Sequence, residues 1–231
     1  MTPPTSPPFS PANSPPLLAP NLSSPITVEG KFLTLFLTSE IGLRTSGVLH
    51  GGIAEADVGQ QTASLKVTAK LAFVENHQDK LFHELSVYNH LASNDVKGIP
   101  PVLGMFHNAR DQGPYCLVLR HAGLSIHDRN DASISISQLY VPYLLLRPVY
   151  LDSKLCSHQF DEVLKAIHDA GIVHGNLQLN NLLINDSGDV GIVDFDHARL
   201  SYDTKEHERE RQSLAGLLKA VVSRAADRLN N

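Results

Sequence analysis

The chain has little cysteine and no surplus of positive charge. Its 231 residues include two cysteines, Cys116 and Cys156, without the paired spacing of a disulfide framework, so the sequence favours free thiols in a reducing compartment. Lys and Arg total 19 against 24 Asp and Glu, a formal net charge of −5. This balance implies no broad basic surface, and we predict no nucleic-acid partner.

Long apolar runs are also missing. No run reaches the roughly 18 residues that a membrane-spanning helix needs. The start of the sequence, from Met1, has neither the basic nor the apolar region of a secretory signal. We therefore predict no membrane contact and an intracellular, cytoplasmic protein. A hydrophobic fraction of 42% is enough for one or two compact domains with a core.

Proline is concentrated at the N-terminus. Nine of the 14 prolines fall within residues 1–25. Because proline removes a backbone donor and fixes φ, a segment so rich in it favours an extended, unpacked chain. We predict a disordered tail over residues 1–28, which is a candidate contact for a protein partner.

The hydrophobic pattern then alternates between strands and helices. Strands are predicted at 31–37, 47–51, 64–73, 102–106, 115–119, 182–184 and 190–193. Helices are predicted at 78–91, 160–170 and 206–222. The first part of the chain therefore has the order β-β-β-α-β-β.

Two short motifs carry the chemistry. His174-Gly175-Asn176-Leu177 leads to Asn181, and Asp194-Phe195-Asp196 follows a short hairpin. The phosphotransferase patterns are H-x-D-L-x-x-x-N and D-F-G. Asn176 stands where the first pattern has its aspartate, and a carboxamide cannot accept the proton that this aspartate takes. A general base typically contributes about 10²–10⁴-fold in rate, so activity is in question.

The same motifs suggest a metal site. Asn181 precedes the hairpin and Asp194 follows it, so both oxygens can return to one place. Hard oxygen ligands suit Mg²⁺, which keeps several waters and shares substrate phosphates. We predict that Asn181 and Asp194 are metal ligands.

Phosphoryl transfer from a nucleotide also needs a cation on its α- and β-phosphates, and the sequence contains a candidate. Lys70 ends Val67-Thr68-Ala69-Lys70, which is close to the V-A-I-K pattern. Glu84 on the following helix is its predicted partner. Lys66 is a rival on the same strand face, but the residues before it do not match this pattern.

Gly42 and Gly47 flank a segment after the first strand. Glycines let backbone amides approach a phosphate closely, so we expect either a phosphate cover or a simple hairpin turn. Arg44 occupies the middle position, where the phosphate-loop pattern has a glycine. It would contact a phosphate or block the loop.

Over roughly residues 38–200 these motifs resemble the protein-kinase-like superfamily. The His-Gly and Asp-Phe-Asp variants are similar to the aminoglycoside and choline kinase branch and to divergent fungal protein-kinase-domain proteins. The resemblance implies an α+β, bilobal fold with a β-rich N-lobe at 29–120 and a truncated helical C-lobe at 121–231. It also implies ATP with Mg²⁺ in the interlobe cleft. Leu119 would then lie behind the adenine, and Arg120 to Ala122 would form the hinge.

The sequence departs from this family in two further places. About 35 residues follow Asp196, without the A-P-E signature, so a peptide substrate would have little to dock on. Residues 140–157 interrupt a helical pattern, and removing them would join Leu139 to His158. This segment is either a retained intron or a surface insertion.

Three hypotheses follow. The first is a pseudokinase that binds ATP and Mg²⁺ with weak or absent transfer, acting by binding or scaffolding. The alternative is an active ATP-dependent phosphotransferase for protein or small-molecule hydroxyls, with Asn176 tolerated. The third is a decayed gene product that folds poorly.

Overall fold

The fold is α+β, as predicted, and the chain divides into two compact units. The computed structural model describes residues 33–58, 61–107, 113–130 and 153–229. The first unit comprises Met1–Leu85 and Pro101–His121, and the second comprises Ser86–Pro100 and Ala122–Asn231. Contacts therefore group Ser86–Pro100 with the second unit, whereas the sequence analysis placed this segment in an N-lobe at 29–120. The tail at 1–28 and most of the 140–157 segment lie outside the described residues.

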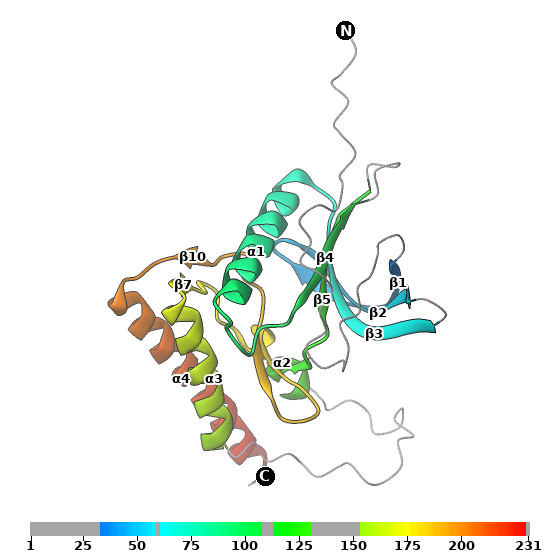
Figure 1. The fold of residues 1–231 in the computed structure, drawn as a ribbon. Coiled ribbons are helices and arrows are strands. Elements are labelled where there is room, and N and C mark those ends of the chain that lie inside the picture. Colours follow the sequence, from blue (N-terminus) through cyan, green and yellow to red (C-terminus); the bar gives the residue numbers. More distant parts are fainter. Residues whose placement is uncertain (1–32, 59–60, 108–112, 131–152, 230–231) are drawn as a thin grey trace. The chain divides into compact units, whose positions relative to one another are not determined.

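The first unit is built on an antiparallel sheet in the order β1-β2-β3-β5-β4. Its elements follow the predicted order β-β-β-α-β-β (Figure 1). They are β1 (Leu33–Arg44), β2 (Gly47–Val58), β3 (Gln61–Ala72), α1 (Glu75–Ser93), β4 (Val102–His107) and β5 (Tyr115–Arg120). Helix α1 belongs to the first unit as far as Leu85 and to the second unit from Ser86 onward. The first three strands are longer than predicted, because their polar positions also pair across the sheet.

Alternation along the strands gives this sheet its apolar core. Paired residues on neighbouring strands point to the same face. The core cluster on one face contains Ala54, Val67, Ala69, Cys116 and Val118. Burial raises the pKa of the Cys116 thiol to about 11, so this cysteine is an inert packing residue.

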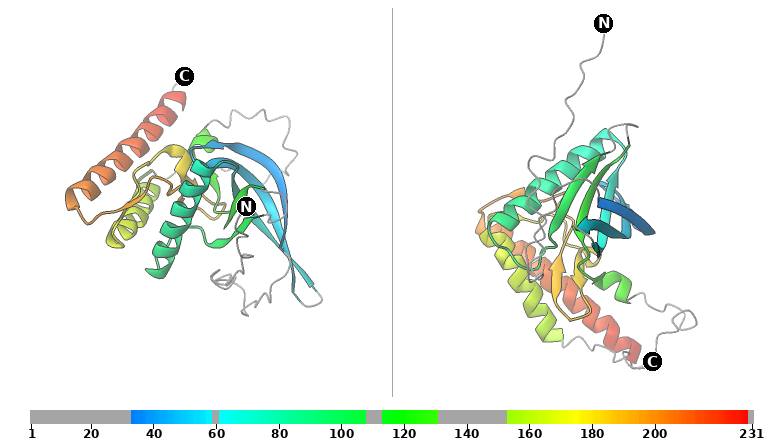
Figure 2. Two further views of the ribbon diagram at one scale, coloured as in Figure 1. Left: turned by 90° about the horizontal axis from the view of Figure 1, so that it is seen from above. Right: turned by 45° about the vertical axis from the view of Figure 1, so that its right-hand side comes forward.

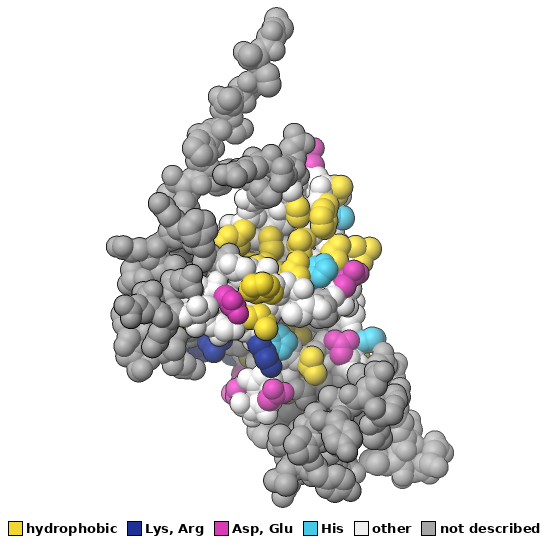
Figure 3. Space-filling view, turned by 90° about the vertical axis from the view of Figure 1, so that its right-hand side faces the viewer, with side chains coloured by type: hydrophobic (Ala, Val, Ile, Leu, Met, Phe, Trp, Pro, Cys, Tyr) yellow, Lys and Arg dark blue, Asp and Glu magenta, His cyan; other side chains and the backbone are white. Residues whose placement is uncertain are grey.

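β1 forms one edge of the sheet and exposes apolar side chains. Phe36, Ile41 and Leu43 are among the exposed large hydrophobic residues, and hydrophobic side chains gather on the face seen in Figure 3. The β1–β2 pairing shifts register between Leu37 and Ser39 and again between Glu40 and Gly42. Such bulges twist an edge strand and hinder further pairing.

The second unit combines helices with short strands. α3 and α4 lie side by side and contact each other (Figures 1 and 2). Its elements are β6 (Leu124–Ser125), α2 (Ile126–Asn130), α3 (Ser153–Asp169), β7 (Ile172–Val173), the 3₁₀ turn η1 (Leu179–Asn181), β8 (Leu182–Ile184), β9 (Val190–Ile192), β10 (Arg199–Leu200) and α4 (Thr204–Leu229). The strands pair as β6-β8-β9 and as β7 with β10.

Helix α4 has one buried apolar stripe. Leu214, Leu218 and Val221 are buried, and Leu217 is half-buried. The spacing of three and four residues places these side chains on one helix face. Among the residues that the structure describes, no helix combines the length and apolar character needed to cross a bilayer.

Candidate functional site

The loop that begins at His174 is fixed by hydrogen bonds of its own imidazole. His174 is completely buried. Its Nε2 lies 2.9 Å from the carbonyl oxygen of Val193, and its Nδ1 accepts a bond from the Asn176 amide. Because a carbonyl can only accept, Nε2 carries the proton and the ring is neutral. The side chain thus ties the loop to the strand that leads to Asp194.

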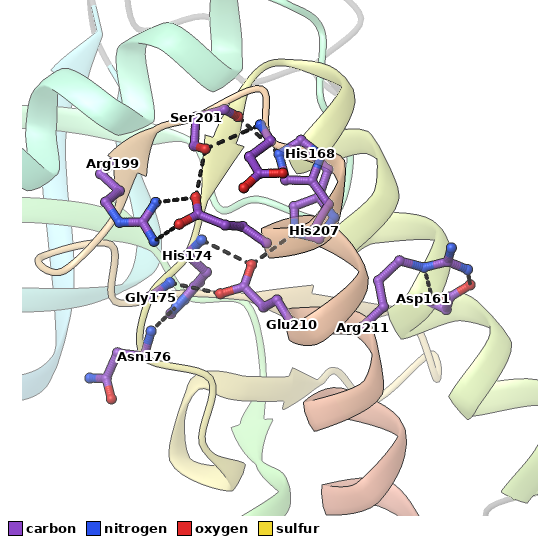
Figure 4. Close-up of polar contacts among 12 residues, drawn as sticks. Asp161, His168, His174, Gly175, Asn176, Arg199, Ser201, His207, Glu210 and Arg211 are labelled. Atoms are coloured by element: carbon purple, nitrogen blue, oxygen red, sulfur yellow. Dashed lines mark hydrogen bonds and ion pairs between the residues drawn. The ribbon is translucent and has the colours of Figure 1, made fainter.

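A carboxylate from α4 anchors the same loop from the other side (Figure 4). Glu210 accepts bonds from the backbone amides of His174 at 3.1 Å and Gly175 at 2.7 Å. It also pairs with Nε2 of His168 at 2.8 Å. Burial alone would raise the pKa of Glu210, but these three hydrogen bonds hold it below its ordinary value. Glu210 therefore stays ionised and fixes the entrance of the loop.

Asn176 is held by its neighbour within the loop. The Nε2 of Gln178 donates to the Oδ1 of Asn176 at 2.5 Å. Asn176 is half-buried and brings no negative charge. The position expected to hold a base therefore holds a fixed carboxamide, as the sequence states.

The two predicted metal ligands lie at the ends of the β8–β9 hairpin. Asn181 is buried, and its Nδ2 donates to the backbone carbonyl of Asn176. The backbone amide of Val193 donates to the carbonyl of Asn181 at 3.0 Å, which links the residue before Asp194 to the loop. Asp194 is 9% exposed. One backbone bond of the hairpin thus joins Asn181 to the residue that precedes Asp194.

This donor set fits Mg²⁺ better than a softer metal. It offers a carboxylate and a carboxamide oxygen. Within the described ranges, no group of three or more His, Cys, Asp or Glu is arranged to hold a metal ion. An ion here would complete its shell with water and phosphate oxygens, which is how Mg²⁺ binds beside nucleotides.

The first unit contains the predicted lysine–glutamate pair. Nζ of Lys70 donates to Oε2 of Glu84 at 2.7 Å, and the side chains are 4% and 1% exposed. Lys66 is exposed. Burial and pairing therefore distinguish Lys70 from its rival, and its contact with a nucleotide stays a prediction.

The segment flanked by Gly42 and Gly47 is a tight β-hairpin. Arg44 pairs with Gly47, so Thr45 and Ser46 alone form the turn. A Cβ on Gly47 would lie 2.1 Å from the carbonyl oxygen of Leu71, and only glycine fits there. A role of this turn over phosphates stays a prediction.

The predicted adenine contacts fall where the chain passes between units. Leu119 is buried in β5 and pairs with Thr68 of β3. The second unit resumes at Ala122, after His121. The backbone amide of Arg120 donates a hydrogen bond to the carbonyl oxygen of Pro101 at 2.9 Å. The roles proposed for Leu119 and Ala122 stay predictions.

Few residues separate Asp194 from α4. Between Asp194 and Thr204 the structure has one short strand, β10. Arg199 on this strand donates to the Glu206 carboxylate through both of its terminal nitrogens, Nη1 and Nη2, and the Ser201 hydroxyl donates to the same carboxylate. These bonds hold the connection against the first turn of α4 (Figure 4).

The sequence pattern did not identify Glu210 as part of the site. It lies in a run of charged residues, from Glu206 to Arg211, that reads as a solvated helix face. An acidic residue nearly two turns into a helix is a weak signal, because many such residues face solvent. Its half-buried position, with two loop amides pointing at it, distinguishes it in the structure.

Stability should depend on pH through His174. Burial lowers its pKa from the ordinary value of 6.5. As the pH falls below about 6.5, the unfolded chain takes up this proton before the folded chain does, so the free energy of unfolding decreases by up to about 1.4 kcal/mol per pH unit. Chemical denaturation between pH 7.5 and 5 should show this loss.

The control for this experiment is another histidine. His174→Gln should be less stable at pH 7.5 but should lose less stability on acidification. His158, whose side chain is 69% exposed, provides the matched variant His158→Gln, which should keep the wild-type slope. A His174→Gln profile as steep as wild type would contradict the assignment.

Comparison with known proteins points to kinases. No family model matches the chain. The mitogen-activated protein kinase spk1 of Schizosaccharomyces pombe is 32% identical over 37% of this chain and 29% of its own length. The mitogen-activated protein kinase mpkC of Emericella nidulans is 30% identical over 48% of this chain and 30% of its own.

A plant kinase gives the longer match. The mitogen-activated protein kinase homolog NTF3 of Nicotiana tabacum is 30% identical over 65% of this chain and 38% of its own length. The chain thus spans well under half of each of these curated relatives. The similarities support a protein-kinase-like relationship and a kinase-like domain.

Proposed function

We propose that this kinase-like domain binds ATP with Mg²⁺ and transfers phosphate weakly or not at all. The observation that carries the proposal is the state of Asn176. Its loop is held from both sides by His174 and Glu210, but the residue itself offers a carboxamide bonded to Gln178. The loop thus has the hydrogen bonds that would position a catalytic residue, but its residue 176 is not a base.

Lys70 is the proposed phosphate-binding cation. A buried ammonium is costly unless a partner compensates it, and Glu84 does so at 2.7 Å. The pair keeps the charge on Lys70 and fixes its position on β3. In kinases the equivalent lysine pairs with the α- and β-phosphates.

Asn181 and Asp194 are the proposed Mg²⁺ ligands. When bound, Mg²⁺ would neutralise charge on the phosphate oxygens. The protein's part is to orient two oxygens: the bond from Nδ2 to Asn176 fixes the amide of Asn181, and the β8–β9 hairpin sets its distance along the chain from Asp194. The predicted intracellular location is part of this proposal and agrees with the free thiol of Cys116.

An active phosphotransferase is the second candidate. In phosphoryl transfer, positioning and electrostatics dominate over covalent chemistry, and the anchored loop provides positioning without a base. The short β10 connection favours a small hydroxyl compound over an extended peptide as acceptor. A phosphotransfer assay of the wild-type protein separates the two candidates.

The binding proposal is tested by measuring ATP affinity with and without Mg²⁺, before and after Asp194→Ala. We expect Mg²⁺ to strengthen ATP binding by wild type, and the substitution to abolish this strengthening while Mg²⁺-free binding remains. Isothermal titration calorimetry or thermal shift would report both. Since Asp194 has a φ of 74°, Asp194→Asn is a useful second variant, because Asn tolerates this backbone region well.

The control is a nearby exposed carboxylate. Asp186 lies in the β8–β9 turn and is exposed, so Asp186→Ala should bind ATP and Mg²⁺ as wild type does. If wild type binds no ATP under either condition, the proposed function is wrong. If Asp194→Ala responds to Mg²⁺ like wild type, the metal assignment is wrong.

A further inference from the structure

Asp194 has a backbone conformation that needs support. Its φ of 74° lies in the left-handed region, which residues with a Cβ rarely adopt. Among the described residues, Asp95 is the other non-glycine example, in an exposed turn. Asp194 is buried, so water does not supply the hydrogen bonds of its backbone. Neighbouring groups must therefore hold it.

Tyr88 provides such a group. This residue of α1 is 1% exposed, and its hydroxyl oxygen accepts a hydrogen bond from the Asp194 amide at 3.4 Å, with both groups buried. Tyr88 and Asp194 belong to the same compact unit. Buried backbone amides are almost always bonded, and this bond, at 3.4 Å, is at the long end of the range for an N–H···O hydrogen bond.

The ring of Tyr88 fixes the next residue as well. Phe195 packs edge-on against Tyr88, with ring centroids 5.1 Å apart and planes at 81°, and it also contacts His174 at 4.9 Å. Phe195 is fully buried. The tyrosine thus acts on consecutive residues, through its ring on Phe195 and through its hydroxyl on Asp194.

We propose that Tyr88 is a positioning residue whose hydroxyl holds the Asp194 turn in its metal-binding conformation before the metal arrives. This inference rests on the proposed function, in which Asp194 is a Mg²⁺ ligand. A phenylalanine at this position would preserve the packing on Phe195 and would lose the bond to the Asp194 amide. The hydroxyl therefore has a role that is separable from the aromatic ring.

The consequence is a preorganised ligand. If the turn samples other conformations, the apparent Mg²⁺ affinity falls by the fraction of time for which the binding conformation is lost. A single hydrogen bond typically shifts an equilibrium by roughly 3- to 10-fold. Removing the hydroxyl should weaken Mg²⁺ binding by about this factor and should leave ATP binding in the absence of Mg²⁺ unchanged.

The experiment compares wild type with Tyr88→Phe by two measurements. Hydrogen exchange of the ligand-free protein, followed by mass spectrometry on peptides that contain Asp194, should be faster in the variant. The Mg²⁺ concentration that half-maximally strengthens ATP binding should rise about 3- to 10-fold. Tyr115 has an aromatic environment of its own, 4.9 Å from Phe82, so Tyr115→Phe is the matched loss of a hydroxyl and should change neither result.

Exchange in α3 serves as the internal reference. Equal acceleration around Leu164, which is fully buried, would mean that the hydroxyl supports the whole core and would overturn the positioning role. Unchanged exchange at Asp194 with unchanged Mg²⁺ response would overturn it too. If wild type shows no Mg²⁺-dependent ATP binding, the proposed function fails, and the exchange data still decide whether Tyr88 holds the turn.

Discussion

Asn176→Asp should raise the rate of phosphotransfer by about 10²–10⁴-fold, the usual contribution of a general base. The substitution replaces an NH₂ group by an oxygen and keeps the oxygen that Gln178 contacts. The loop supports do not involve this side chain, since Glu210 and His174 hold backbone atoms. We therefore expect a gain in rate without loss of structure, measured with labelled ATP on small hydroxyl acceptors and generic protein acceptors.

A second carboxylate in the same loop controls for the added charge. Gln178 is exposed, and Gln178→Glu should give no increase in rate, because its carboxylate lies two residues from the base position. Equal activity of wild type and Asn176→Asp would show that the carboxamide does not limit transfer and would refute the pseudokinase interpretation. If both proteins bind ATP and neither transfers phosphate, the cause of the inactivity lies outside Asn176.

Breaking the buried ion pair should be the most destabilising single change. Lys70→Met removes the cation and leaves a carboxylate in a position that is 1% exposed. Loss of one partner of a buried pair typically costs about 3–5 kcal/mol. We expect the unfolding midpoint in urea to fall accordingly, and nucleotide binding to be lost.

The double variant separates stability from binding. Replacing both partners by apolar residues of similar size is often neutral for stability, so Lys70→Met with Glu84→Leu should recover most of the lost stability. ATP binding should not recover, because the ammonium is still missing. Lys66→Met is the matched single change on the same strand, and as Lys66 is exposed it should alter neither property. Restored ATP binding in the double variant would contradict the role given to Lys70.

The order of elements in the first unit could be predicted from the sequence because local patterns encode it. Alternation predicted the strands of the first unit, and helical spacing predicted α1, α3 and α4. The pairing of Lys70 with Glu84 was also foreseeable, since strand and helix are adjacent in the chain and the two residues lie 14 positions apart. In each of these cases the signal and the partner lie close together in sequence.

Other features could not be predicted, because their partners are distant or their side chains have two uses. Glu210 reaches back 36 residues to His174, and nothing in its charged surroundings marks that contact. The ring of Tyr88 is buried on the apolar face of α1. The partner of its hydroxyl lies 106 residues away, and no local pattern marks that contact. The division of α1 between units also depends on contacts made by segments far along the chain.

The anchor at Glu210 has a consequence for biosynthesis. The amides of His174 and Gly175 find their acceptor in a helix that the ribosome produces 35 and 36 residues later. Until α4 has emerged and folded, the loop that carries Asn176 has no carboxylate to set its backbone. A nascent chain halted between Leu200 and Glu210 would therefore contain every motif residue and the partners of the His174 imidazole, but it would lack this second anchor until α4 is complete.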